Sequence, residues 1–323
     1  MKLRALVLAL IITVCAANIS HAEEVQPKVA IAYDIGFLGD NSFNDSVNAA
    51  LSVAKKKYNL VEPFIREIPT NGTAVDRLTR LRFLAKSGYT LIITVGPSYR
   101  DTVKRVSMEF PEIQFAMIND RTLGQLNISN IYFNENDGAY LAGVLAATTS
   151  KRKSVGFVGS EPELLASFTK GVKDTSLKVK VVNIPFPDEI GALKKALTRV
   201  DIAYSTWDGD AAVLTTIIEN FSGKVRLISE APDQFFAALP SAQKVIIGKV
   251  EKNLVKPIDQ LVGAALSNRA IIDVVDEVNG IYGREYSVKN GGVTVKVFSN
   301  AAGARAVSLA ISRIRAGKVS TRP

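Results

Sequence analysis

The feature that most constrains the fold is a twice-repeated alternation of short apolar runs with longer amphipathic stretches. The apolar runs predict strands at residues 29–33, 64–68, 90–95, 114–118 and 131–133, and again at 154–158, 180–184, 201–204, 225–229, 245–250 and 293–298. Helices are predicted between them, at 42–58, 74–87, 98–110, 139–150, 164–174, 190–198, 211–220, 255–267 and 301–316. Apolar strands alternating with helices are typical of parallel sheets covered on both faces. The sequence therefore predicts an α/β fold of two doubly wound lobes.

The chain is long enough for two domains, since it has 323 residues. The late elements are expected to complete both sheets, so the chain should cross between the lobes more than once, near residues 133–137, 250–252 and 282–286. The predicted N-terminal lobe is 27–133 plus 252–282, and the C-terminal lobe is 134–251 plus 283–323. Two such lobes can hold a ligand in the cleft between them.

The first 22 residues have the pattern of a secretory signal peptide. Lys2 and Arg4 precede an apolar stretch at 5–17, and Ser20-His21-Ala22 offers a small-residue cleavage site. The apolar stretch is too short to span a membrane, and a buried first helix is the alternative. We therefore expect a periplasmic or other extracytoplasmic protein.

A lipid anchor is a second possibility at the N-terminus. Cys15 lies in the signal-like stretch, and lipidation of this cysteine would tie the protein to the membrane. The residue before it is Val14, where lipoprotein signals usually have a small residue.

Signal cleavage would remove the single Cys and the single His, at positions 15 and 21. The mature chain would then have no disulfide, no Cys nucleophile, no Ser-His-Asp triad and no His-ligated metal. Catalysis would need carboxylate, Lys or Tyr chemistry. Asp208-Gly209-Asp210 is too short for a calcium loop, and a dinucleotide fingerprint and a P-loop are missing. We expect no cofactor.

Charge does not indicate a nucleic-acid partner. The net charge is +9 and falls to +7 when the two basic residues of the signal are removed. The remaining Lys and Arg residues are spread along the chain, whereas nucleic-acid binding needs a clustered basic face or a reading motif.

The strand at 29–33 leads into a glycine-containing loop and then a helix, and two of the residues that follow it are candidate ligand contacts. Ligands of open α/β sheets bind at the carboxyl ends of the strands. Asp34 can accept hydrogen bonds there, and Phe43 offers a flat face for stacking. The alternatives are an Asp that braces the loop and a Phe that faces the core.

Other strand ends carry further candidates. Asn119 and Asp120 end a strand of the same sheet, although Asn and Asp also favour ordinary turns. In the second half, Tyr204, Trp207 and Asp208 lie at a strand end and form a candidate opposite wall of the cleft. Packing between the lobes is the alternative for Trp207.

A specific motif consists of Asp34 followed at a fixed distance by Asp40-Asn41-Ser42-Phe43-Asn44. With this motif the chain resembles a known family, the basic membrane protein family of bacterial solute-binding proteins, which is the purine nucleoside receptor group of ABC importers. Further matches are Leu91–Gly96, Phe110-Pro111, Tyr132-Phe133 with Gly138–Gly143, Val155–Gly159, Phe168–Gly171 and Asp233-Gln234. The similarity extends over nearly the whole mature chain.

The resemblance implies a type I periplasmic-binding-protein-like fold, in which two lobes close over a nucleoside. It implies that Asp34 and Asn44 bind polar edges of the base and that Phe43 stacks on one of its faces. The second-lobe aromatic residue that stacks on the other face falls at Tyr204.

For the ribose, the resemblance implies contacts of the hydroxyl groups with an acidic residue near Glu230 and a lysine near Lys252. It also implies a small-molecule ligand, an ABC permease as partner and no catalysed reaction. We expect the protein to act as a monomer.

Two departures from the family pattern bear on ligand choice. The family usually has Asp where this chain has Asn119, and Thr206-Trp207-Asp208-Gly209-Asp210 replaces a glycine-rich loop. A receptor for a sugar, a small amide or a signalling ligand on the same scaffold is the main alternative, and an enzyme with Asp or Tyr chemistry is another. A transcription regulator would need a DNA-reading helix-turn-helix before residue 29, where the signal peptide stands.

Overall fold

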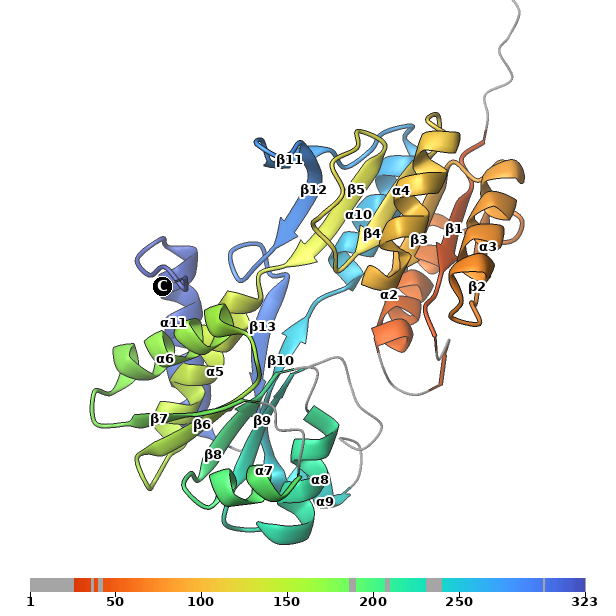
Figure 1. Cartoon of the computed structure of the whole chain (residues 1–323). Helices are drawn as coiled ribbons and strands as arrows, with labels where there is room; N and C mark the ends of the chain where they lie inside the picture. The colour runs from red at the N-terminus through yellow and green to blue at the C-terminus, as the bar shows by residue number, and fades with distance from the viewer. Residues whose placement is uncertain are drawn as a thin grey trace, which may run out of the picture.

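The computed structural model describes residues 26–35, 38–39, 43–185, 190–206, 210–230, 240–298 and 300–322. These residues form two β-sheets, each covered by helices on both faces, which lie end to end in an elongated molecule (Figure 1). The predicted α/β fold with two mainly parallel sheets is confirmed.

The first sheet has seven strands in the order β11-β12-β5-β4-β3-β1-β2. Their bounds are β1 (Val29–Ala32), β2 (Ile65–Ile68), β3 (Leu91–Val95), β4 (Gln114–Ile118), β5 (Ile128–Phe133), β11 (Asp273–Asp276) and β12 (Ile281–Tyr286). All neighbours pair in parallel except the edge strand β11, which is antiparallel to β12.

Successive side chains of a strand point to opposite faces of the sheet, so alternate residues of the first sheet face opposite layers of helices. Ile31 packs towards α2 (Phe43–Tyr58) and α10 (Val255–Leu266). Ala32 packs on the other side, towards α3 (Ala74–Lys86) and α4 (Arg100–Glu109). A short 3-10 turn, η1 (Pro97–Tyr99), leads into α4. Because both faces are covered, the central strands β1, β3 and β4 are largely apolar, and this is the pattern from which they were predicted. The polar edge strand β11 and its neighbour β12 were not predicted from the sequence.

The second sheet has six strands in the order β13-β10-β9-β8-β6-β7, with only β13 antiparallel to its neighbour. Its strands are β6 (Ser154–Val158), β7 (Lys180–Ile184), β8 (Ile202–Ser205), β9 (Arg226–Glu230), β10 (Ile246–Lys252) and β13 (Val293–Val297). One face carries α5 (Glu135–Thr149), α6 (Pro162–Thr175) and α11 (Ala301–Arg315), and the other carries α7 (Ile190–Leu197), α8 (Asp210–Asn220) and α9 (Pro240–Val245) (Figure 1).

The chain passes between the two sheets three times, from β5 to α5, from β10 to α10 and from β12 to β13. The predicted lobe limit between residues 282 and 283 is wrong, because it falls inside β12, which pairs with β5 as far as Tyr286. Gly283 lies inside β12, opposite Asn130 of β5. A Cβ at Gly283 would lie 1.9 Å from the carbonyl oxygen of Asn130.

Within the described ranges, no helix has the length and apolar character needed to cross a membrane. The predicted signal peptide and Cys15 lie outside the described residues.

Candidate functional site

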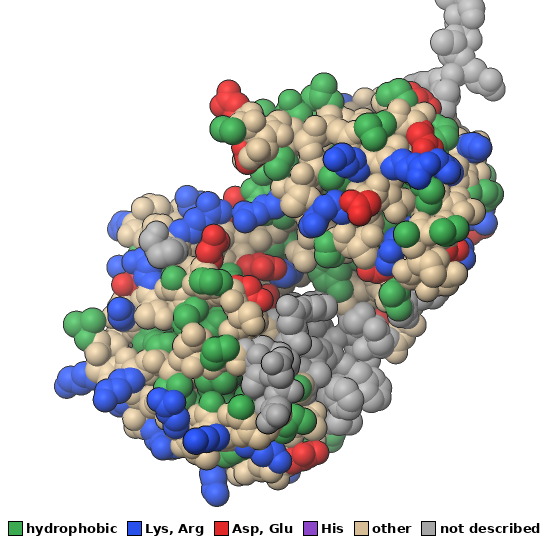
Figure 2. All heavy atoms as spheres, in the orientation of Figure 1, with side chains coloured by type: hydrophobic (Ala, Val, Ile, Leu, Met, Phe, Trp, Pro, Cys, Tyr) green, Lys and Arg blue, Asp and Glu red, His purple; other side chains and the backbone are tan. Residues whose placement is uncertain are grey.

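A cavity of about 430 Å3 lies between the two sheets and is lined from both of them. The first-sheet side contributes Asp34, Ile35, Phe43, Asn44, Val95, Gly96, Pro97 and Asn119. The second-sheet side, with the crossings, contributes Glu135, Glu161, Leu164, Thr206, Glu230 and Lys252. Figure 2 shows the hollow between the lobes, with acidic side chains on the second-lobe side.

Topology explains why the cavity forms here. In the order β2-β1-β3 the strand sequence reverses between β1 and β3, and in β7-β6-β8 it reverses between β6 and β8. Such switch points leave a crevice at the carboxyl ends of the strands. The two crevices face each other, because residues that follow β1, β3, β6 and β8 line the same cavity.

Asp34 follows β1 and is held by two donors from the first lobe. Ser98 donates its hydroxyl to Oδ2, and Arg77 Nη2 lies 3.3 Å from Oδ1. Gly96 leaves room for the carboxylate, since its φ is +92° and a Cβ there would lie 3.4 Å from Asp34 Oδ2. The loop thus presents Asp34 to the cavity in a fixed orientation.

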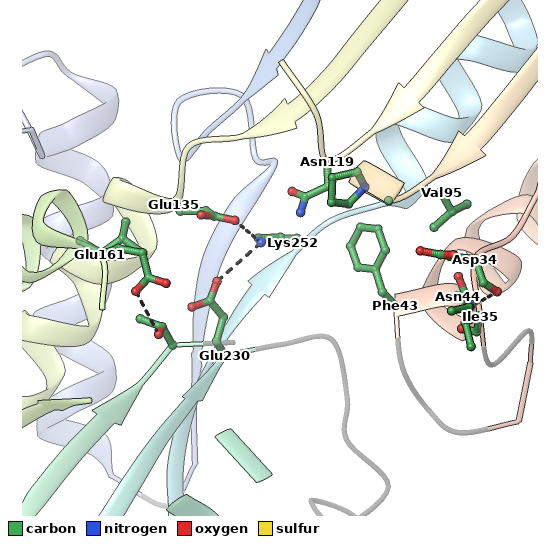
Figure 3. Close-up of a pocket in the computed structure, with 14 residues that line it drawn as sticks. Asp34, Ile35, Phe43, Asn44, Val95, Asn119, Glu135, Glu161, Glu230 and Lys252 are labelled. Atoms are coloured by element: carbon green, nitrogen blue, oxygen red, sulfur yellow. Dashed lines mark hydrogen bonds and ion pairs between the residues drawn. The ribbon is translucent and has the colours of Figure 1, made fainter. Parts of the chain in front are cut away.

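Phe43 and Asn44 begin α2 and line the same side of the cavity as Asp34 (Figure 3). Asn44 is only 5% exposed. Its Nδ2 donates to the backbone carbonyls of Asp34 and Ile35, each at 3.3 Å. The side chain of Asn44 therefore braces the loop and lines the cavity at the same time.

On the other side, Lys252 lies between two carboxylates (Figure 3). Its Nζ is 2.5 Å from Glu135 Oε1 and 3.6 Å from Glu230 Oε1. Burial raises the pKa of the Glu230 carboxyl, and Lys252 opposes this rise. Burial alone would lower the pKa of Lys252, but the two carboxylates outweigh burial and raise it. Lys252 is therefore a charged donor at neutral pH.

Glu161 and Thr206 complete the second-sheet side. They follow β6 and β8, and the Thr206 hydroxyl donates to Glu161 Oε2 at 3.3 Å. The backbone N–H of Ser160 donates to the same oxygen at 3.1 Å. The wall formed by Glu135, Glu161 and Glu230 carries three acids against the single cation Lys252.

The structure brings together six of the residues singled out from the sequence. The six are Asp34, Phe43, Asn44, Asn119, Glu230 and Lys252. Trp207 and Asp208 lie outside the described residues, as does most of the loop considered for calcium.

The expectation that Tyr204 forms a cavity wall is wrong. Its side chain is 1% exposed and stacks on Phe168, with ring centroids 5.6 Å apart and an interplanar angle of 20°. Its hydroxyl donates to Glu230 Oε2 at 3.0 Å. Tyr204 thus lies behind the wall and supports Glu230, because β8 is a central strand covered on both faces.

Asp120 also fails to line this cavity. It is buried and accepts from Arg100 Nε at 2.9 Å and from the Thr122 N–H at 2.8 Å. The alternative interpretation, an Asp that braces a turn, describes it better. Its neighbour Asn119 is the residue that faces the cavity.

Several lining residues were missed from the sequence, and for three of them a signal existed. Glu161 follows a predicted strand of the second half by three positions, and Glu135 lies within a predicted crossing. Applying the strand-end rule to every predicted strand would have selected Glu161 and also Gly96. Arg77, in the middle of α3, had no such signal.

Comparison with protein families agrees with the motifs. The family model Bmp, described as "ABC transporter substrate-binding protein PnrA-like", matches residues 27–185. The chain is 30% identical over 190 residues to the "CD4+ T-cell-stimulating antigen" of Listeria monocytogenes serovar 1/2a, a match that covers 55% of this chain and 51% of the relative. It is 27% identical over 197 residues to the "ABC transporter nucleoside-binding protein BmpA" of Lactococcus lactis subsp. cremoris. That match covers 60% of this chain and 56% of the relative. The matches therefore span about half the length of these relatives.

Solved structures share the fold at low sequence identity. A transcriptional activator of the comK gene from Bacillus halodurans superposes with a TM-score of 0.70 at 16% identity, covering 89% of this chain and 97% of that one. An ABC transporter solute-binding protein from Aeropyrum pernix K1 superposes with a TM-score of 0.65 at 17% identity, covering 91% and 92%. The predicted type I periplasmic-binding-protein-like architecture is thereby confirmed. Over residues 27–185 the chain is therefore similar to the Bmp family of PnrA-like ABC transporter substrate-binding proteins.

Proposed function

We propose that this protein binds a nucleoside in the cavity between its lobes and delivers it to an ABC permease. The observation that carries the proposal is the pairing of an aromatic ring, Phe43, with the Glu135–Lys252–Glu230 cluster across one cavity of about 430 Å3. That volume is in the range of small-molecule sites. The printed name of the Lactococcus lactis relative, a nucleoside-binding protein, adds support.

The first lobe suits a planar base. Phe43 offers a face for stacking, and Asp34 and Asn44 line the cavity beside it (Figure 3). Oxygen atoms of a carboxylate and an amide can accept from the ring N–H and amino groups of a base. In this proposal the base lies against Phe43 with its polar edge towards Asp34.

The second lobe suits the ribose. A ribose hydroxyl both donates and accepts, so it can donate to the Glu230 carboxylate and accept from Lys252 Nζ. The two groups lie 3.6 Å apart, close enough to serve neighbouring hydroxyls. Because Glu230 is buried, an unmatched ligand group at this point would be costly.

A ligand held by both lobes would favour the closed arrangement, since it gains contacts from both walls only when they approach. The three chain crossings between the sheets are the candidate hinge. The proposal includes no catalysed reaction, an extracytoplasmic location after signal cleavage and a monomeric receptor. Lipidation of Cys15 would add a membrane anchor.

The proposal is tested by calorimetric titration of the protein lacking residues 1–22 with nucleosides, with ribose and arabinose as controls. Nucleosides should bind and sugars should not. Phe43→Ala should weaken nucleoside binding by about 1–3 kcal/mol, whereas Phe83→Ala, which alters an exposed ring on α3, should not change it.

Mass spectrometry of small molecules that co-purify with the mature protein is the complementary measurement. A bound nucleoside would support the proposal. A sugar or amide recovered in its place, with no nucleoside affinity by calorimetry, would exclude the nucleoside and favour the other small-molecule receptors on this scaffold.

A further inference from the structure

We infer that the first-lobe wall selects a 2-amino-6-oxopurine, a guanine-type base, over adenine. The inference rests on the proposed function and extends it from nucleosides in general to one class of base. It depends on which hydrogen-bonding atoms of Asp34, Asn44 and Asn119 remain available to a ligand.

Asn44 can offer the ligand only its oxygen. Both contacts of its Nδ2 are with carbonyl oxygens, those of Asp34 and Ile35, at 3.3 Å each. The opposite orientation would place the amide oxygen against these two carbonyl oxygens, which is repulsive. In the described part of the chain nothing donates to Asn44 Oδ1, so this oxygen is left as an acceptor in the cavity wall.

Asp34 offers acceptors as well. One carboxylate oxygen accepts from Ser98, and the other faces the guanidinium of Arg77. Arg77 is itself fixed, since its side chain is 11% exposed and its guanidinium lies 5.6 Å from the Tyr99 ring centroid. A carboxylate oxygen has two lone pairs, so each oxygen keeps one for a ligand. Asp34 and Asn44 together therefore offer the ligand hydrogen-bond acceptors and no donor.

Asn119 adds a donor at the end of β4. Its φ is +67°, a backbone conformation that Asn tolerates, and it places the residue on the cavity wall. Within the described ranges its side chain has no hydrogen-bond partner, so its NH2 group is available to a ligand carbonyl. An ionised Asp at this position would have no such donor.

Guanine matches this arrangement of acceptors and donor. It has two adjacent donors, N1–H and the 2-amino group, next to the O6 acceptor. Hypoxanthine lacks the 2-amino donor. Adenine has an acceptor at N1, which would face carboxylate oxygens, and a donor at position 6, which would face the Asn119 donor. Guanosine should therefore bind more tightly than inosine, and inosine more tightly than adenosine.

The experiment is calorimetric titration of the mature protein with guanosine, inosine, adenosine and 1-methylguanosine. Leaving the acceptors of Asp34 and Asn44 unmatched should cost adenosine and 1-methylguanosine about 100-fold in affinity relative to guanosine, and inosine about 10-fold. Asn119→Asp should weaken guanosine binding and improve adenosine binding, because the new carboxylate can accept from the 6-amino group.

Asn268→Asp is the matched control, since Asn268 is exposed, also has a positive φ of 50°, and lies in the turn after α10, away from the cavity. The Asn268→Asp variant should leave the order of the nucleoside affinities unchanged. If adenosine or 1-methylguanosine binds as tightly as guanosine to the unmodified protein, the inference is overturned while the proposed function stands. If no nucleoside binds, both are overturned.

Discussion

Lys252 Nζ lies 2.5 Å from Glu135 Oε1, and this ion pair joins two of the three passages of the chain between the lobes. Glu135 begins α5 just after the first passage, and Lys252 ends β10 at the start of the second. The side chain of Lys252 is 6% exposed and that of Glu135 is 37% exposed, so water reaches the pair from the Glu135 side only. Lys252 therefore lines the cavity and also joins two of the chain segments that cross between the sheets.

Lys252→Met should strongly destabilise the fold. The change leaves Glu230 buried without its cation, and breaking a buried ion pair by removing one partner costs about 3–5 kcal/mol. Urea denaturation measures the loss. Lys57→Met is the control, because it removes an exposed ion pair with Asp259. Its free energy of unfolding should remain close to that of the unmodified protein. Equal stabilities for the two variants would show that the buried cluster is not a stabilising element.

Glu230 should make stability depend on pH. Burial raises its pKa in the folded protein, so the folded state binds this proton more tightly than the unfolded chain, where the pKa of Glu is about 4.3. The contribution of Glu230 to the free energy of unfolding is therefore complete below that value and is lost as the pH rises through the raised pKa.

Glu230→Gln removes this titration and keeps an oxygen that can accept from Tyr204. The free energy of unfolding, measured in urea at pH 5 and pH 8, should fall less with rising pH in the variant than in the unmodified protein. Lys252 does not add to the pH dependence of stability between pH 5 and pH 8, because it titrates well above pH 8 in both the folded and the unfolded protein. Identical pH profiles would contradict a raised pKa for Glu230.

Tyr204→Phe tests whether this core tyrosine supports the ligand wall. The variant keeps the ring stacked on Phe168 but removes the hydroxyl that donates to Glu230 at 3.0 Å. Leaving the buried carboxylate short of a donor should cost about 1–3 kcal/mol in stability. It should also weaken ligand binding, because Glu230 loses its fixed orientation.

Tyr140→Phe is the matched control for that change. Tyr140 is equally buried and donates to Asp174 at 3.0 Å, away from the cavity. It should lose some stability and keep the ligand affinity. If calorimetry gives the same affinity for both variants and the unmodified protein, Tyr204 acts only as a core residue.

Local patterns were enough to predict the described strands other than β11 and β12, and part of the site. The strands were predictable because sheets covered on both faces leave continuous apolar runs, as in β3. Asp34, Phe43 and Asn44 belong to a single strand–loop–helix unit. The strand-end rule indicated Asp34 and Phe43, and the family motif added Asn44. Glu230 and Lys252 came from the family resemblance, although the strand-end rule could also have selected them, because they follow the predicted strands at 225–229 and 245–250.

The errors arose where burial depends on distant neighbours. Tyr204 ends a central strand, and its position in the sequence does not say whether the ring faces the cleft or the core; packing on Phe168 decides this. Gly283 has the residue type of a turn, yet it lies inside a strand because Asn130 approaches it. Arg77 is a helix residue whose partner, Asp34, is 43 positions away in the sequence. Such long-range pairings cannot be read from spacing.

Arg77→Met should weaken ligand binding more than it weakens the fold. Arg77 Nη2 lies 3.3 Å from Asp34 Oδ1, and Met fills similar space without the charge, so Asp34 would keep Ser98 as its donor but lose its orientation towards the cavity. Mispositioning a ligand group of this kind should cost roughly 10-fold in affinity or more. Arg80→Met is the control, because Arg80 lies on the same helix and pairs with Asp76. Calorimetry should show a weaker ligand complex for the first variant only, and Arg77→Lys should restore part of the affinity. Equal affinities for all three variants would mean that Asp34 is positioned by its loop and Ser98 alone.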